Sequence, residues 1–303
     1  MKPDGAPDLE LIAYLQRWCG YCLTGIVTEQ MLLVCHGGGQ NGKRTFVQTI
    51  EEVLGAYADT ISVETLLAQR FEGNAGPAEL AKLDGVRFVQ SGENDAGRRL
   101  NEARIKLLTG NDPVPARRLR GDPFFYDPQF KLLLHTNHKP KIRGQDKGIW
   151  RRVKLVPFTV TIPEGERDPL YFEHRLRAEL EGILAWMVRG CLAWQRDGLG
   201  EPKTITDATA EYRAAEDIVR QFVAESLVRD ASAIEWQKTV YSVFLGWCKD
   251  QSIRQPLSSQ ALAERVCELT GCERKRGDHG QEFIGVRIRM NTDVFVDDEV
   301  EKV

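Results

Sequence analysis

A glycine-rich segment, lying between an apolar run and an amphipathic segment, constrains the fold more than any other part of this chain. The run Met31–Cys35 is continuously apolar, as in a strand buried on both faces of a parallel sheet. Gly37-Gly-Gly-Gln-Asn-Gly-Lys43 follows and matches the first seven positions of G-x-x-x-x-G-K-[ST]. From Lys43 onward apolar residues recur at helical spacing. This order predicts a phosphate-binding loop, in which backbone N–H groups and a helix N-terminus face an anion.

The residue after the lysine departs from that motif. Arg44 stands where a Ser or Thr hydroxyl normally binds Mg²⁺, and it is too large and too positive to imitate one. Thr45 lies one residue on, about 100° round the helix, and can serve directly or through water. The other interpretation is a site that hydrolyses poorly. The predicted phosphate-contacting set is Gly37, Gly38, Gly39, Gln40, Asn41, Gly42, Lys43, Arg44 and Thr45.

Further apolar runs alternate with helical segments and predict an α/β fold with a mostly parallel sheet, whose ligands bind at the carboxyl ends of the strands. The expected strands are 60–63, 86–90, 130–135 and 153–156, and residues 167–199 are expected to be helical.

Two of these strands end in polar side chains. Glu93 is the candidate for orienting water or holding a metal ion, with Asp95 as the fallback, because Gly92 occupies the position of the usual Asp.

Asn137 follows the strand at 130–135 and can hydrogen-bond both a γ-phosphate and an attacking water. Arg151 and Arg152 precede the last strand, and an arginine that reaches a neighbouring subunit's γ-phosphate would neutralise charge in the transition state. Adjacent arginines point in different directions, so we expect one of the two to do this and the other to form a surface ion pair.

Charge is unevenly distributed along the 303 residues. The formal net charge is −3, yet residues 98–154 carry 15 Lys and Arg against 5 Asp and Glu. A basic block in an otherwise acidic chain predicts contact with a polyanion, either nucleic acid or nucleotide phosphates.

No apolar stretch is long enough to cross a membrane. Cys19-x-x-Cys22 lacks a second pair at zinc spacing, so we expect core packing there rather than a metal site.

A second unit is expected from about Asp217. Its segments suggest helix, helix and a basic two-stranded wing, which is a winged-helix pattern; a small helical cap without DNA contact is the alternative.

The motifs together resemble the superfamily-three AAA+ helicases, in the branch of phage and plasmid primase-helicases related to the poxvirus primase-helicase. The resemblance covers roughly residues 9–230. It rests on Gly37-x-Gly-x-Asn-Gly-Lys-x-Thr-Phe46, Glu93, Lys106-x-Leu-Thr-Gly-x-Asp112, Phe130-Lys-x-x-x-x-Thr-Asn137 and Asp146-x-x-x-Trp-Arg-Arg152.

The resemblance implies a homo-oligomeric ring, usually a hexamer, that binds ATP and Mg²⁺ between subunits. Lys43, Glu93 and Asn137 would act in cis and Arg151 or Arg152 in trans, with Thr45 and Glu93 as metal ligands. It also implies a hairpin over 113–126 that grips single-stranded or forked DNA through Arg117, Arg118 and Arg120. The aromatic residues at 124–126 would mostly anchor this hairpin.

The resemblance also gives the expected organisation: a helical lead-in (1–30), an ATPase core (31–165), a helical lid or linker (166–215), a winged-helix-like domain (216–291) and an acidic tail (292–303). No primase domain is expected within the chain, so a separate primase or other replication protein is a possible partner. The expected setting is the cytoplasm of a bacterium or phage-infected host.

The motifs and the resemblance thus predict an ATP-dependent DNA helicase motor of phage, plasmid or mobile-element replication. The alternative is a DNA-binding, nucleotide-switched replication or assembly factor that hydrolyses little ATP. A small-molecule P-loop kinase is the third interpretation, disfavoured by Asn137, the Trp150-Arg151-Arg152 run and the winged-helix pattern.

Overall fold

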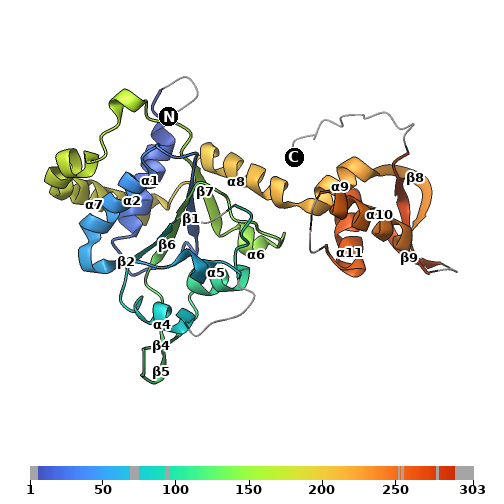
Figure 1. The fold of residues 1–303 in the computed structure, drawn as a ribbon, viewed down its shortest axis with the longest axis horizontal. Coiled ribbons are helices and arrows are strands. Elements are labelled where there is room, and N and C mark those ends of the chain that lie inside the picture. Colours follow the sequence, from blue (N-terminus) through green and yellow to red (C-terminus); the bar gives the residue numbers. More distant parts are fainter. Residues whose placement is uncertain are drawn as a thin grey trace. The chain divides into compact units, whose positions relative to one another are not determined.

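The computed structural model describes residues 6–68, 75–92, 96–251, 253, 256–277 and 280–290, without the side chains of 75–77. The chain forms two compact units, Met1–Glu216 and Asp217–Val303 (Figure 1). Within the described residues, no helix is long and apolar enough to cross a membrane.

A five-stranded sheet, parallel throughout, forms the centre of the first unit, in the order β2-β3-β6-β1-β7. Its strands are β1 (Leu32–His36), β2 (Ala58–Thr60), β3 (Phe88–Gly92), β6 (Lys131–Thr136) and β7 (Val153–Pro157). From β1 the chain passes to β2 at one edge, returns through β3 to β6 beside β1, and then crosses to β7 on the other side of β1. A sheet of this kind binds ligands beyond the carboxyl ends of its strands, next to this reversal of strand order.

Helices cover both faces of the sheet. One layer consists of α1 (Leu9–Tyr21), α2 (Lys43–Leu54) and α7 (Leu180–Asp197), which pack on the sheet through residues such as Trp18, Val47 and Met187. The opposite layer includes α3 (Val63–Leu66), α4 (Ala75–Ala81), α5 (Glu102–Leu108), α6 (Lys147–Trp150) and α8 (Lys203–Glu216). Successive residues of β1 alternate between the layers, which explains the apolar run: Leu32 and Val34 face one, Leu33 and Cys35 the other.

Short elements complete this unit. The antiparallel hairpin of β4 (Val114–Arg117) and β5 (Pro123–Tyr126) projects beside α4 (Figure 1). Three helical turns, η2 (Glu164–Glu166), η3 (Phe172–Leu176) and η4 (Arg177–Glu179), precede α7, and η1 (Gly55–Tyr57) follows α2.

The strand predicted over 60–63 is misplaced. Only Thr60 belongs to β2, because the Ser62 hydroxyl accepts from the Glu64 N–H and starts α3 at Val63. The helix predicted over 167–199 is continuous only from Leu180.

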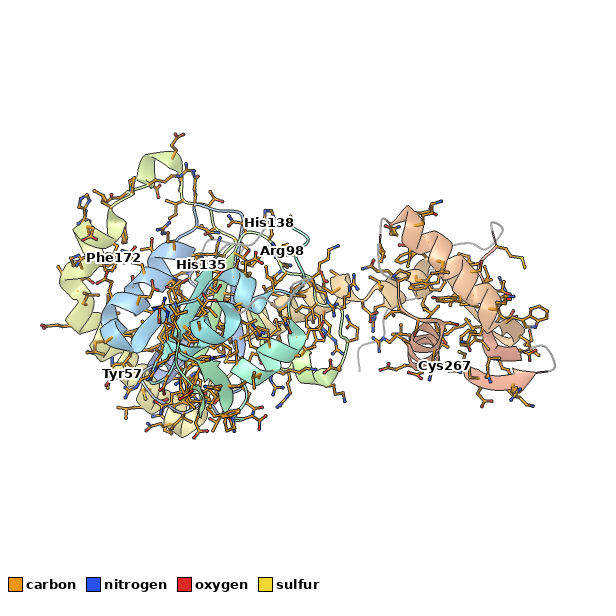
Figure 2. The ribbon with its side chains drawn as sticks, turned by 60° about the horizontal axis from the view of Figure 1, so that its bottom comes forward. Tyr57, Arg98, His135, His138, Phe172 and Cys267 are labelled. Carbon is orange, nitrogen blue, oxygen red and sulfur yellow. The ribbon has the colours of Figure 1, made fainter. Side chains whose placement is uncertain are left out.

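The second unit has its own buried core. Its helices are α9 (Ile218–Ser226), α10 (Gln237–Asp250) and α11 (Ser259–Thr270), and its antiparallel sheet has the order β8-β10-β9. The strands are β8 (Leu227–Trp236), β9 (Glu273–Gly277) and β10 (Gly280–Ile288). The sequence did not predict β8, because polar residues in the middle of the strand interrupt the alternation of apolar and polar side chains. Figure 2 shows the side chains that fill this unit, with Cys267 labelled near the end of α11.

Candidate functional site

The glycine-rich loop turns tightly between β1 and α2. Gly39 and Gly42 have φ angles of 99° and 82°, which glycine adopts without steric cost, and Gln40 is also left-handed at 48°. Gly42 caps α2 without a side-chain hydrogen bond. The first N–H groups of α2 are therefore open to an anion rather than satisfied by a capping side chain.

Close packing fixes the start of the loop. A Cβ atom on Gly37 would lie 2.1 Å from the Phe158 carbonyl oxygen and 2.4 Å from the Asn41 amide nitrogen, so only glycine fits. The Asn41 amide donates to the Phe158 carbonyl at 3.0 Å. Phe158 follows β7, so this bond ties the loop to the neighbouring strand.

Lys43 lies at the centre of the site. Its side chain is buried, at 6% exposure. Its ammonium group donates to the Gly37 carbonyl at 2.8 Å, to Asn41 Oδ1 at 3.0 Å and to Asn137 Oδ1 at 3.0 Å. The structure thus brings together the loop lysine and the polar residue after β6, which lie 94 residues apart in the chain.

The surroundings of the loop are cationic. The pKa of His36, at the end of β1, is lowered first by burial and then by the positive charges of Lys139 and Lys43. A neutral imidazole beside a buried ammonium group leaves a net positive charge at this end of the sheet, as an anion site requires.

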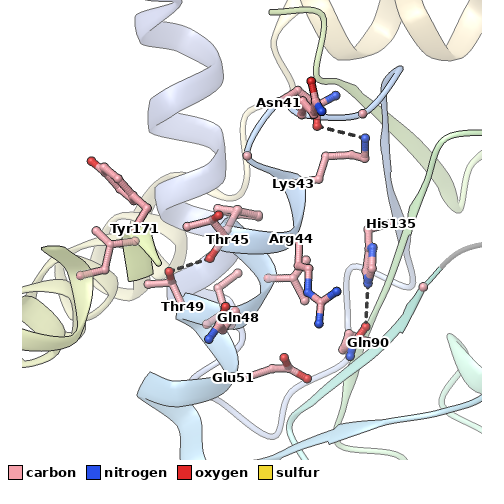
Figure 3. A pocket seen from close by; sticks show the side chains of 18 of the residues that line it. Asn41, Lys43, Arg44, Thr45, Gln48, Thr49, Glu51, Gln90, His135 and Tyr171 are labelled. Atoms are coloured by element: carbon pink, nitrogen blue, oxygen red, sulfur yellow. Dashed lines mark hydrogen bonds between the residues drawn. The ribbon is translucent and has the colours of Figure 1, made fainter. Parts of the chain in front are cut away.

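Arg44 and Thr45 point to different sides of α2. Figure 3 shows Arg44 directed toward Gln90 and His135, whereas Thr45 lies toward Tyr171. The Thr45 carbonyl accepts from the Thr49 hydroxyl at 2.7 Å. Two candidate ligands that follow Lys43 therefore face opposite walls of one cavity.

At the end of β3, a histidine ring occupies the space of the side chain that an Asp at position 92 would have. A Cβ on Gly92 would lie 2.4 Å from the His135 ring, which occupies that space and has Nε2 3.0 Å from Gln90 Oε1. Gly92 is thus explained by its neighbour on β6. Glu93 and Asp95 lie outside the described residues, so the roles predicted for them remain predictions.

The cavity beside the loop measures about 1580 Å³ and extends along α2. Its far wall comes from the segment after β7, including Ile162 and Tyr171, which the sequence reasoning did not single out. The Ile162 N–H donates to the Gln40 carbonyl at 2.8 Å and so holds this segment against the loop. No periodicity or motif marks these residues, so only the fold reveals them.

No three His, Cys, Asp or Glu side chains in the described part of the chain lie close enough together to hold a metal ion. Cys19 and Cys22 are buried free thiols, and burial raises the pKa of Cys22 to about 12. Both side chains pack in the hydrophobic core that α1 forms with the sheet.

The two arginines before β7 have different environments. Arg152 is buried and donates to the Gly148 carbonyl at 2.7 Å and to the Thr109 hydroxyl at 3.2 Å. Arg151 is exposed and donates to Gln30 at 2.7 Å. Both lie at the amino end of β7, at the opposite edge of the sheet from Lys43, so neither reaches the loop of its own chain.

The predicted hairpin is present as β4–β5, and its tip carries the three predicted arginines, all exposed: Arg117 ends β4, and Arg118 and Arg120 lie in the turn. Arg117 Nε donates to the Gly121 carbonyl at 2.9 Å, and the Arg118 guanidinium lies 5.1 Å from the centre of the Phe124 ring. Arg120 has a left-handed φ of 60°.

Aromatic residues anchor the base of the hairpin. The Tyr126 hydroxyl donates to the Leu80 carbonyl at 2.9 Å, and Phe124 packs on the core. Phe125, by contrast, is 70% exposed, and Leu119 in the turn is 86% exposed.

Comparison with known proteins finds similarity to viral proteins named as putative helicases and primases. Residues 35–152 match a family of unknown function, DUF5906. A protein of Acanthamoeba polyphaga mimivirus named "Putative helicase" is 28% identical over 74% of the chain. A protein of Frog virus 3 with the same designation is 29% identical over 82% of the chain, and one of African swine fever virus named "Putative primase" is 23% identical over 79%. The chain spans about a quarter of each relative, 25%, 28% and 26% of their lengths.

A solved structure titled the apo structure of NrS-1 C terminal region has the same overall fold. It covers 88% of this chain and 60% of its own, with a TM-score of 0.55 and 13% sequence identity.

Proposed function

The chain is a relative of viral proteins named as helicases and primases, as its motifs predict, and from that premise we propose that it is the ATP-driven motor of a DNA replication helicase. In this proposal residues 31–165 are a superfamily-three AAA+ core, 166–215 a lid and 216–291 a winged-helix domain. ATP binds at the loop Gly37–Lys43, and hydrolysis moves the chain along single-stranded DNA.

The observation that carries this proposal is the contact of Lys43 with Asn137 at the carboxyl edge of the sheet. Bound phosphates would displace the three neutral oxygens from the ammonium group and pair with its positive charge. Asn137 then lies where it can hold both the γ-phosphate and an attacking water without changing charge. Glu93 is our candidate for orienting that water.

The positions of two arginine groups support work between subunits. Arg151 is exposed at the edge of the sheet opposite Lys43, so it can complete only a neighbouring chain's site, as in a hexameric ring. The hairpin arginines at 117, 118 and 120 would hold the DNA backbone without reading its sequence.

Replacing Lys43 by alanine tests the phosphate loop. We expect the variant to lose nucleotide binding and DNA-stimulated ATP hydrolysis, because the buried positive charge is removed. Lys154→Ala is the control, since Lys154 pairs with Glu201 at 2.6 Å. Hydrolysis by Lys43→Ala at the rate of the unmodified protein would refute the assignment.

Arg44 and Gly92 favour a second function, a DNA-binding assembly factor that is switched by nucleotide and hydrolyses little. Steady-state hydrolysis with and without single-stranded DNA separates the two. Turnover that rises on DNA addition supports the motor, and tight nucleotide binding without turnover supports the switch.

A further inference from the structure

Arg44 is a cation that lines the phosphate cavity directly beside Lys43. Its side chain is exposed to the cavity and directed toward Gln90 and His135 (Figure 3). Within the part of the chain that the structure describes, its guanidinium group makes no hydrogen bond or ion pair. A guanidinium group presents five N–H donors in a planar fork that matches phosphate oxygens.

Among the residues that the structure describes, the same side of the cavity does not suit a magnesium ion. The position of the expected hydroxyl ligand is taken by a positive charge, and Thr45 faces the other wall (Figure 3). The His135 ring fills the space over Gly92, the position of the usual Asp, and Glu93 and Asp95 lie outside the described residues. A divalent cation placed here would be repelled by two neighbouring side-chain cations, Lys43 and Arg44.

We propose that Arg44 binds the β- and γ-phosphate oxygens directly and supplies the positive charge that a metal ion supplies elsewhere. Nucleotide binding by this chain is then independent of divalent cations. The inference rests on the proposed function, because it assumes that a nucleotide occupies the loop. It adds a phosphate ligand at the one position where the loop departs from its motif.

The cavity also holds carboxylates, and within the described residues none of them forms an ion pair with Arg44. Glu51 lies on α2 about two turns beyond Arg44 and accepts from the Thr60 hydroxyl at 3.1 Å. A guanidinium group kept apart from these acids remains available to an anionic ligand.

The test measures the affinity for ATP by calorimetry, first in excess EDTA and then in excess MgCl2. The variants are Arg44→Thr, which restores the hydroxyl of the motif, and Arg44→Lys, which keeps the charge but loses the fork. Arg196→Gln is the matched control, because Arg196 is exposed and pairs with the adjacent Asp197 at 2.7 Å. The melting temperature of each variant is recorded alongside.

We expect the unmodified protein and Arg196→Gln to bind ATP equally well in both buffers. Arg44→Thr should bind about 10- to 100-fold more weakly in EDTA, as expected for hydrogen bonds to a charged group, and recover part of this loss with Mg²⁺. Arg44→Lys should fall between the two.

Two results would overturn the inference: ATP binding by the unmodified protein that needs Mg²⁺, or an Arg44→Thr variant that binds as tightly in EDTA. If Arg44→Thr keeps its affinity but melts at a lower temperature, Arg44 acts in the fold and not on the ligand. Failure of the proposed function gives a different pattern, in which Lys43→Ala binds ATP as the unmodified protein does, or neither binds it in either buffer.

Discussion

At the residue scale, the His135 side chain leaves no room for any side chain at position 92, which explains the glycine there. The ring lies where a Cβ on residue 92 would be, at 2.4 Å. We expect Gly92→Ala to lower the free energy of unfolding by about 1–3 kcal/mol, the usual cost of overpacking. Gly165→Ala is the control, because nothing lies within 4 Å of a Cβ there.

Chemical denaturation measures both variants. In a His135→Ala background the cost of Gly92→Ala should largely disappear, since the two residues couple only through contact. An equal cost in both backgrounds would contradict this explanation.

Lys131 gives a second prediction at this scale. It is buried at the start of β6, and burial lowers its pKa from 10.5 to about 8. Between these values the unfolded chain binds more protons than the folded one, so the contribution of Lys131 to stability rises with pH and is least favourable below about pH 8.

The stability difference between the unmodified protein and Lys131→Met should therefore shift toward the unmodified protein between pH 8 and 10, by at most about 3 kcal/mol. Urea denaturation at the two pH values measures it, with Lys154→Met as control. A difference that does not change with pH would contradict the assigned pKa.

At the scale of elements, the β4–β5 hairpin combines an anchored base with a cationic turn. We expect the triple replacement of Arg117, Arg118 and Arg120 by alanine to weaken single-strand DNA binding and to reduce its salt dependence. The slope of log K against log salt should fall by about 2 if three phosphate contacts are lost.

The matched control replaces three exposed arginines elsewhere in the same unit: Arg175, Arg189 and Arg196. Equal loss of affinity in both triple variants would mean that net charge, and not the hairpin, determines binding.

The sequence predicted most elements that carry a strong local signal. The strand–loop–helix around Gly37–Lys43 and the strands near residues 88, 131 and 153 lie where apolar runs placed them, because strands buried on both faces need such runs. β8 escaped prediction, since its half-exposed strand has the polar middle Arg229–Ser232.

The site was predictable only where a motif marks it. The contact of Lys43 with Asn137 follows from two parallel strands ending at one edge. The cavity wall at Ile162 and the His135 ring over Gly92 depend on tertiary packing, which no local pattern encodes. The burial of Arg152 likewise depends on tertiary contacts, with Gly148 in α6 and with Thr109 after α5.

At the scale of the whole molecule, the separation of Arg151 from Lys43 predicts sites shared between chains. We expect Lys43→Ala and Arg151→Ala to be inactive alone, whereas oligomers assembled from both should recover part of the ATP hydrolysis. In such mixtures one variant's lysine meets the other's arginine at some interfaces.

Steady-state hydrolysis of co-purified, differently tagged variants measures this recovery. Arg152→Ala is the comparison, and we expect it to lose stability through its buried hydrogen bonds rather than to complement. Mixed oligomers as inactive as their parents would argue against a site completed by a neighbouring chain.

The placement of β6 limits how force can pass through this molecule. The strand leaves the hairpin a few residues after Tyr126, ends just before Asn137, and is hydrogen-bonded along both sides, to β1 and β3. A strand bonded on both sides cannot slide by itself, so the distance between the base of the hairpin and Asn137 is fixed. In the proposed motor, the base of the hairpin and the edge of the nucleotide site would therefore move together rather than past one another.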